Sequence, residues 1–364
     1  MTTKPERLHL VVEGTTRAEL GRSRGAQLRG TLGSAYAKYA ELFRASGISE
    51  AQEQDAVERT LAVLQGWRPE VVAELEGIAE ASGVPLAQVV ALNARTEILA
   101  LGEKSHPECS TIAARVGAGA RADGTADPGR MMGVQTWDWH IELDPFWHTH
   151  EVAGPGYRFA GVTEQGILGK IGVNSAGLAT HFNILAHTQD GPGGVPMHIL
   201  SNVVMTECAT VAEAIELVRA APIGSSSSLT LLDAERGVSL EITPVGVFEV
   251  PQREGAVIRT NHFQDPGSIA GEKPDFSPES PDRLALVQSR LAAGLPADAD
   301  AMVQLLVSGE GEAPLTCVPD MSLQYGERWA SLCTVVTEPA ARTIRILDGM
   351  PTEAATGAWR VVTL

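Results

Sequence analysis

The first third of the chain has the hydrophobic spacing of amphipathic helices. Helix-forming residues dominate 15–46, although glycines interrupt this stretch. Ser49 precedes the next apolar stripe and stands three residues before Gln52, which is the spacing of a capping box. A shorter amphipathic stretch closes at Gly83, and another begins at Pro85, a favoured first helical residue. These patterns predict a helical N-terminal third.

From about residue 109 the pattern changes to short runs that are rich in β-branched residues. Gly, Asn or Asp turns separate several of these runs, as expected between strands. Helical patterns interrupt them at 196–221 and 280–294, and a polar, Pro- and Gly-rich stretch at 264–282 predicts a loop. Strands, then helices, then strands indicate an α+β structure in layers, with antiparallel sheets.

Composition and charge narrow the function classes. The 364 residues are 44% hydrophobic, which is enough for one large core or two smaller ones. The formal net charge of −17 repels phosphate groups and argues against nucleic acid or an anionic membrane as partner. No apolar run approaches the length of a membrane span, and the N-terminus lacks the features of a signal peptide. A cytoplasmic location is therefore expected.

The four cysteines match no metal-binding or redox spacing, so free thiols are expected. Cys109 differs from the other three because it follows the helix-breaking Pro107 and heads the first strand-like run. If the peptide bond before Cys109 is cleaved, its new α-amino group, with a pKa near ~8, can serve as the base for its own thiol. The alternative is an ordinary buried strand cysteine.

A set of segments in fixed order carries a family resemblance. The chain resembles the acyl-coenzyme A:6-aminopenicillanate acyltransferase family, also called the C45 peptidase family, of the N-terminal-nucleophile hydrolases. It is more distantly similar to the bile-salt and penicillin V hydrolases. The matching segments are PEVVAELEGIAEASGVPLAQVVALNARTEI, ECST, GVQTWDWH, ILGKIGVNSAGLATHFNIL, GGVPMHILSNVVMTECATVAEAIELV, SSSSLTLLDAE, RTNHF and SLCTVVTEPAARTIRI.

The resemblance implies a four-layer αββα sandwich that matures by cutting itself between Glu108 and Cys109. The products would be a helical small subunit, 1–108, and a β-rich large subunit, 109–364. They would remain together as a heterodimer within one composite domain, held by a large apolar core.

The resemblance also assigns roles to single residues. Cys109 is the nucleophile, and Asp138 lies near the new amine, where a carboxylate favours and orients an ammonium. Asn183 contributes to the oxyanion hole and Asn261 completes it. The two tryptophans that flank the aspartate could wall a substrate pocket, with core packing as the equal alternative; they are Trp137 and Trp139.

Two positions depart from the family pattern. The bile-salt type of relative has Arg three residues before the aspartate, where this chain has Gln135. A late arginine is matched only by spacing to Arg328, for which a solvated surface charge is the alternative. Gln135, Arg328 and His181, which stands beside Asn183, complete the candidate pocket.

Two other motifs offer rival chemistry. His140, His148 and His150 lie close in sequence, and an HxH pair on a strand points both rings to one face, which suits a metal. No recognised metal spacing is present, so solvated or pocket-lining histidines are favoured. The serine run at 224–228 lacks the context of a serine nucleophile or phosphate loop, and a turn before a strand explains it.

These observations predict a self-processing amidohydrolase or acyltransferase with a Cys109 acyl-enzyme and without metal or cofactor. The substrate is expected to be a small-molecule amide or an acyl-CoA, and a penicillin is not inferred from the best-known family member. Hydrolysis and acyl transfer share every step up to the acyl-enzyme. The alternative, which Glu108 and Gln135 favour, is an uncleaved, non-catalytic relative that binds a small molecule.

Overall fold

Two β-sheets form the centre of the molecule in this computed structural model, which describes residues 6–102, 109–120 and 126–364. Within these residues the larger sheet has the strand order β1-β6-β7-β8-β9-β10-β11-β12, and the smaller has the order β13-β2-β5-β14-β15-β16. β1 pairs with β6 in parallel, whereas the other pairs of the larger sheet are antiparallel. The strands of the larger sheet are β1 (His9–Glu13), β6 (Trp147–Ala153), β7 (Phe159–Glu164), β8 (Ile171–Asn174), β9 (Ala179–Ile184), β10 (Ser227–Leu232), β11 (Gly237–Thr243) and β12 (Gly246–Pro251).

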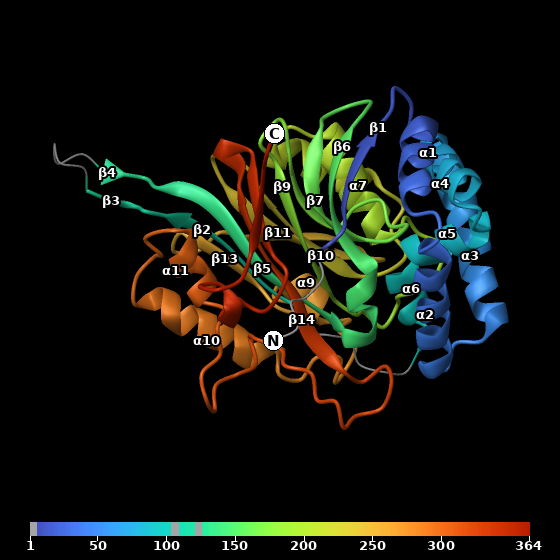
Figure 1. Cartoon of the computed structure of the whole chain (residues 1–364). Helices are drawn as coiled ribbons and strands as arrows, with labels where there is room; N and C mark the ends of the chain where they lie inside the picture. Colours follow the sequence, from blue (N-terminus) through green and yellow to red (C-terminus); the bar gives the residue numbers. More distant parts are fainter. Residues whose placement is uncertain (1–5, 103–108, 121–125) are drawn as a thin grey trace.

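The smaller sheet is antiparallel throughout. Its strands are β2 (Ser110–Val116), β5 (Arg130–His140), β13 (Ala256–Arg259), β14 (Trp329–Glu338), β15 (Thr343–Leu347) and β16 (Trp359–Thr363). Between β2 and β5 the chain runs out into a narrow ribbon, β3 (Gly119–Ala120) and β4 (Ala126–Asp127), which projects from the body (Figure 1).

Helices cover the outer face of each sheet, so the layers are helix, sheet, sheet, helix (Figure 1). α7 (Met197–Glu207) and α8 (Val211–Ala220) pack on the larger sheet, and α10 (Ser280–Ala292) and α11 (Ala299–Gln304) pack on the smaller one. The α+β, four-layer αββα architecture is therefore present. The remaining helices are α1 (Arg17–Gln27), α2 (Leu32–Ala45), α3 (Glu50–Trp67), α4 (Pro69–Ser82), α5 (Leu86–Asn93), α6 (Arg95–Leu99) and α9 (Pro266–Ile269).

The N-terminal helices gather at one end of the layers, and their caps follow from the sequence. The side chain of Ser49 accepts from the amide of Gln52 in a complete capping box. Gly83 ends α4 in the left-handed conformation. Pro85 lies one position earlier than predicted, at the N-cap of α5.

The glycines that interrupt the first helical pattern have a packing role. α1 and α4 cross closely, and a Cβ at Gly21 would lie 2.0 Å from the carbonyl oxygen of Glu74. A Cβ at Gly77 would lie 2.4 Å from the carbonyl oxygen of Ala18. Only residues without a Cβ allow the two backbones to approach this far.

Three predicted boundaries change in the structure. The 15–46 pattern is two helices, α1 and α2, and the 196–221 pattern is also two, α7 and α8. The 264–282 loop contains α9 and the first turn of α10. None of the helices in the described part of the chain is both long and apolar enough to cross a bilayer.

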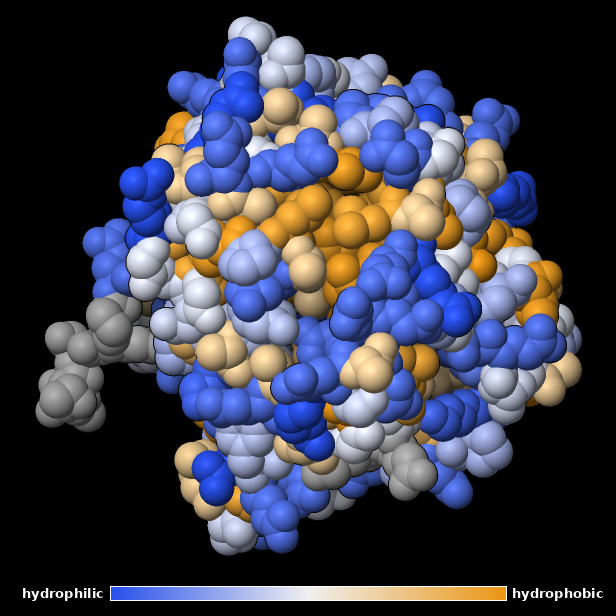
Figure 2. All heavy atoms as spheres, turned by 90° about the vertical axis from the view of Figure 1, so that its right-hand side faces the viewer, coloured by the Kyte–Doolittle hydropathy of each residue, from blue (hydrophilic) through white to orange (hydrophobic). Residues whose placement is uncertain are grey.

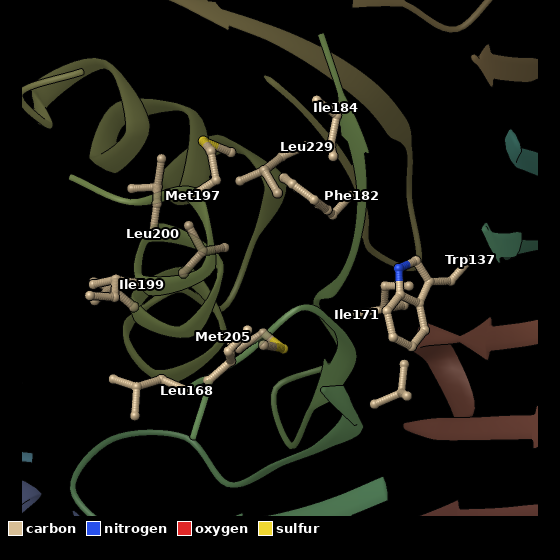
Figure 3. Packing of buried hydrophobic residues seen from close by; sticks show 14 of the residues in the cluster. Trp137, Leu168, Ile171, Phe182, Ile184, Met197, Ile199, Leu200, Met205 and Leu229 are labelled. Atoms are coloured by element: carbon tan, nitrogen blue, oxygen red, sulfur yellow. The ribbon is translucent and has the colours of Figure 1, made fainter. Parts of the chain in front are cut away.

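The main apolar core lies between and around the sheets. It joins side chains of the N-terminal helices, such as Leu75 and Ile98, to Cys109 and to both sheets. In Figure 3 Met197 and Leu200 of α7 form one side of this cluster, and Trp137 of β5 lies at its other end. Figure 2 shows an apolar area, framed by polar side chains, on the face that the N-terminal helices form.

Candidate functional site

Cys109 lies directly before β2 and is fixed by its backbone. Its carbonyl oxygen accepts hydrogen bonds from Asn183 Nδ2 at 2.9 Å and from Arg283 Nη1 at 3.1 Å. Its thiol points to the backbone carbonyl oxygen of Asp138, with Sγ 3.7 Å away. Glu108, the other half of the expected cleavage site, lies outside the described residues. Three segments far apart in the sequence thus hold one cysteine.

The environment of Cys109 keeps its thiol protonated in the intact chain. Cys109 is only 2% exposed. Burial, followed by the nearby carboxylate of Asp138, raises the pKa of the thiol to about 12, while the cations Lys170 and Arg283 act in the opposite direction. A thiol with this pKa is a poor nucleophile near neutral pH.

Asp138 is buried on β5 next to β14. The hydroxyl of Ser331 donates to Asp138 Oδ1 across these two strands. Successive strand residues face opposite ways, so Trp137 and Trp139 share the face away from the Asp138 side chain. The strand therefore presents a carboxylate on one face and two indoles on the other.

The two asparagines are held by different partners. Asn183, on β9, accepts from Thr111 Oγ1 at 2.8 Å, and this bond turns its amide nitrogen toward Cys109. Asn261 follows β13 and donates through Nδ2 to the carbonyl oxygen of Ile184 at 3.0 Å. Ile184, which accepts from Asn261, follows Asn183 directly in the chain, and Asn183 contacts Cys109. Both amides therefore lie at the Cys109 end of the sheets.

Arg283 joins these groups and is not among the residues expected from the sequence. It is fully buried in the first turns of α10 and donates to Ser110 Oγ at 2.9 Å as well as to Cys109. Its other terminal nitrogen, Nη2, donates to Asn261 Oδ1 at 3.0 Å. A signal was available, since Arg283 stands four residues before the buried Val287 and therefore on the apolar face of its helix.

The late arginine indicated by spacing lies elsewhere. Arg328 Nε donates to the carbonyl oxygen of Leu323 at 2.7 Å, and Arg328 Nη1 is 3.6 Å from a carboxylate oxygen of Glu142. Its side chain is partly exposed. Arg283, and not Arg328, is the arginine that contacts Cys109 in this structure.

Gln135 and His181 are buried between the two sheets. The amide of Gln135 bonds to both the backbone NH and the carbonyl oxygen of Phe182. His181 bonds to Gln135 at 3.2 Å and to Thr337 at 2.8 Å, and burial lowers its pKa to about 3. These contacts tie β5, β9 and β14 together.

A cavity of about 240 Å³ is lined by chain neighbours of the site residues, and not by Cys109, Asp138, Asn183 or Asn261 themselves. Trp139 and Ile184, which line it, follow Asp138 and Asn183 directly in the chain. Phe276, which also lines it, precedes Ser277, and the Ser277 hydroxyl accepts a hydrogen bond from Arg283. Its lining is apolar on one part and polar on another. The apolar part includes Leu99, Trp139, Ile184 and Phe276, and the polar part includes Asp190 and Lys273. Trp137, Gln135, His181 and Arg328 are not among the lining residues.

The histidine alternative gains no support from the geometry. His148 and His150 share a face of β6 with ring centroids 5.7 Å apart, but His140 packs on Trp329 at 3.6 Å. Arg24 bonds to Nδ1 of His150. Within the described residues, no group of three or more His, Cys, Asp or Glu side chains is placed to hold a metal ion.

Several known proteins are similar to this chain. The chain is 26% identical over 260 residues to acyl-coenzyme A:6-aminopenicillanic-acid-acyltransferase 40 kDa form of Emericella nidulans, covering 70% of this chain and 69% of the relative. Among solved structures it resembles a Caenorhabditis elegans N-acylethanolamine-hydrolyzing acid amidase ortholog (13% identity, 70% of this chain and 100% of that one, TM-score 0.43). It also resembles penicillin V acylase from Agrobacterium tumefaciens (14%, 70% and 86%, 0.41).

The family model for acyl-coenzyme A:6-aminopenicillanic acid acyl-transferase matches residues 125–353, which is more than half of the chain. This chain belongs to the acyl-coenzyme A:6-aminopenicillanic acid acyl-transferase family.

Proposed function

We propose that this chain cuts itself between Glu108 and Cys109 and then works as an N-terminal-cysteine amidohydrolase or acyltransferase. The observation that carries the proposal is the hold on Cys109 by Asn183 and Arg283 at the first residue before β2. Because these hydrogen bonds hold the carbonyl oxygen of Cys109, the residue should keep its position when the peptide bond on its amino side is broken. Membership of an acyltransferase family supports the same chemistry.

The reaction begins with self-cleavage. The Cys109 sulfur attacks the carbonyl carbon of Glu108, and the C–N bond breaks as the thiol proton passes to the departing Cys109 amine. Water then hydrolyses the resulting thioester, which releases the Glu108 carboxyl group and the Cys109 thiol. That amine then takes the proton of the thiol, and the thiolate attacks the substrate carbonyl. The leaving group takes the proton from the ammonium, and the acyl-enzyme passes its acyl group to water or to an amine.

The neighbouring residues have complementary roles in this proposal. Asp138 stabilises the ammonium form of the new amine, because a buried carboxylate nearby favours a cation. Asn261 completes the oxyanion hole, to which Asn183 contributes while it also holds Cys109 in place. One such donor is worth roughly 3–4 kcal/mol in the transition state.

The cavity next to the site is proposed to receive the acyl group of a small-molecule amide or acyl-CoA. Its apolar wall, with Leu99, Trp139 and Phe276, suits a hydrocarbon or aromatic acyl chain. The two fragments, 1–108 and 109–364, are proposed to remain associated as one composite domain. The apolar core that joins Leu75 and Ile98 to both sheets supports this.

Denaturing electrophoresis with intact-mass analysis tests the proposal. Wild-type protein should yield fragments 1–108 and 109–364, and the larger should gain the mass of an acyl group when offered a panel of amides and acyl-CoAs. Cys109→Ala should stay intact and gain no acyl mass. A wild type that stays full-length would favour the small-molecule-binding alternative. Cleavage or acylation that persists in Cys109→Ala would overturn the assignment of the nucleophile.

A further inference from the structure

A lysine is buried beneath the indoles of β5. Lys170, between β7 and β8, has no exposed side-chain surface, and its Nζ lies 3.6 Å from the ring centroid of Trp137 and 5.8 Å from that of Trp139. Its ammonium pairs with Glu164 at 2.5 Å. A buried lysine is unusual, and one that indole faces and a carboxylate hold in place is set in a single position.

Glu164 has more than one cation to neutralise. The same oxygen, Oε2, pairs with Arg95 at 2.8 Å, and Tyr39 donates to the other oxygen. One carboxylate is thus shared between Arg95 and, when it is protonated, Lys170. Glu97 also faces Arg95, but burial raises its pKa to about 7, so it is only partly charged near neutral pH. The positive charge of Arg95 and Lys170 is therefore not fully neutralised, and these residues can stabilise a further negative charge.

The strand register places Cys109 next to this cation. Ser110 pairs with Thr136 across β2 and β5, so the preceding residue, Cys109, lies opposite Trp137. On the other side of Trp137, across β14, lies Cys333. Directly opposed residues of a sheet point to the same face, so the three form a row, Cys109–Trp137–Cys333. Lys170 lies over the middle of that row, and its charge acts on the thiols at both ends.

We infer that Lys170 is a positioning residue whose ammonium stabilises the thiolate of Cys109, with Glu164 and Trp137 holding the ammonium in place. The inference rests on the proposed function, in which the α-amine of Cys109 takes the thiol proton: the S–H bond breaks and an N–H bond forms. Lys170 neither gains nor loses a proton in that step. It acts through Cys109 and does not need to touch the substrate.

The groups around Lys170 set how its charge depends on pH. They come from several elements: Glu164 on β7, Arg95 on α6, His198 on α7, Cys109 before β2 and Cys333 on β14. Burial lowers the pKa of Lys170 to about 7, and Arg95 acts in the same direction, whereas Glu164 and Cys109 act against them. A thiolate at Cys109 should therefore keep Lys170 protonated, and a protonated Lys170 should favour that thiolate.

The test measures the alkylation rate of Cys109 by iodoacetamide as a function of pH, with peptide mass analysis to separate Cys109 from the other cysteines. Lys170→Met should move the inflection of Cys109 upward by about one pH unit, the size expected when one nearby opposite charge is lost. Lys170→Arg should restore most of that shift. Lys38→Met, on an exposed lysine paired with Glu41, is the matched control and should leave the profile unchanged.

A second measurement uses the wild type and does not depend on a neutral variant that folds. Nζ-labelled lysine resonances, with that of Lys170 assigned from Lys170→Arg, are titrated before and after Cys109 is alkylated. Alkylation removes the thiolate, so the pKa of Lys170 should fall. An unchanged pKa of Lys170, or an unchanged Cys109 profile in folded Lys170→Met, would overturn the inference.

The two proposals fail in different ways. Cleavage and acyl-enzyme formation are read on the same samples by intact mass, and their absence in the wild type counts against the proposed function. If both occur while the thiol and lysine titrations are independent of one another, only the role of Lys170 is wrong. If the chain stays intact, the role of Lys170 fails together with the proposed function on which it rests, because Cys109 then keeps its proton near neutral pH.

Discussion

Arg283 reaches Cys109 from a helix 174 positions further along the chain and donates to its carbonyl oxygen over 3.1 Å. The same guanidinium bonds to Ser110 Oγ and to Asn261 Oδ1. A planar guanidinium presents its donors in a rigid fork, whereas the three donors of an ammonium rotate on a flexible stem. Arg283 therefore sets the position of Cys109 relative to Asn261.

Replacing Arg283 should damage both positioning and fold. Arg283→Met leaves the buried acceptors of Ser110 and Asn261 without their donor, and we expect a stability loss of about 1–3 kcal/mol. With Asn261 released, self-cleavage and acyl-enzyme formation should slow by roughly 10²-fold or more, the cost of losing one oxyanion donor. Intact-mass time courses measure both rates, and urea unfolding measures the stability.

Arg283→Lys and Arg328→Met are the informative comparisons. Lysine keeps the positive charge but lacks the planar arrangement of donors that a guanidinium has, so Arg283→Lys should recover only a small part of the rates of self-cleavage and acyl-enzyme formation. Arg328→Met should keep most of the rate, because Arg328 bonds to Leu323 and pairs with Glu142 instead. Equal losses in Arg283→Met and Arg328→Met would show that the contact with Cys109 is unimportant.

Thr111 should matter through the orientation of Asn183. Its hydroxyl donates to Asn183 Oδ1, which leaves Nδ2 to face the carbonyl oxygen of Cys109. Thr111→Val removes this bond at nearly constant volume and leaves a buried amide oxygen unpaired. We expect about tenfold slower acyl-enzyme formation, equivalent to about 1.4 kcal/mol.

The matched variant Thr111→Ser retains the hydroxyl and should react at close to the wild-type rate. Both variants would be compared in single-turnover acylation, with unfolding curves as the check on structure. If serine and valine are equally slow, the methyl group and not the hydrogen bond is what the site needs.

The sequence predicted those features of the fold that depend on local patterns. The Ser49 capping box is such a case, because it depends on residues a few positions apart. Arg283 and Lys170 could not be predicted from the sequence, because their roles do not depend on residues a few positions away. Their importance comes from contacts between elements far apart in the chain. The apolar face of α10 indicates that Arg283 is buried, but no local pattern identifies the partner of either residue. Spacing alone led to Arg328, whose contacts lie elsewhere.

Buried histidines should make the fold sensitive to acid. Burial lowers the pKa of His148 to about 3 from an ordinary value of 6.5, so the unfolded chain binds a proton that the folded chain does not. This contribution to stability is fully present above about pH 6.5 and is lost as the pH falls toward 3. Its slope is about 1.4 kcal/mol per pH unit for one histidine.

His148→Leu isolates the contribution of His148 to the pH dependence of stability. Neither ring nitrogen of His148 has a hydrogen-bond partner within the described part of the chain, so the substitution orphans no neighbour there. The free energy of unfolding, measured in urea at a series of pH values from 7 to 4, should fall less steeply for the variant than for the wild type. Parallel curves would mean that His148 is already neutralised in some other way.

Cys109 should change reactivity when the bond before it is cut. In the intact chain its pKa is raised from 9.0 to about 12, and this shift alone lowers the thiolate fraction near neutral pH by about a thousandfold. The free α-amine made by cleavage supplies a base, and its ammonium a nearby positive charge. Both favour the thiolate, so the large fragment should react much faster with iodoacetamide than the full-length chain does.

A partly processed sample contains both species in one tube and provides its own control. Limited alkylation followed by intact-mass analysis should find the label on fragment 109–364 while the full-length chain stays unmodified. Cys333 is buried in the intact chain, with its thiol pKa raised by burial, and we expect it to stay buried after cleavage, so its labelling reports any loss of structure. Labelling of Cys109 at equal rates in both species, with Cys333 unlabelled, would show that cleavage does not activate the thiol.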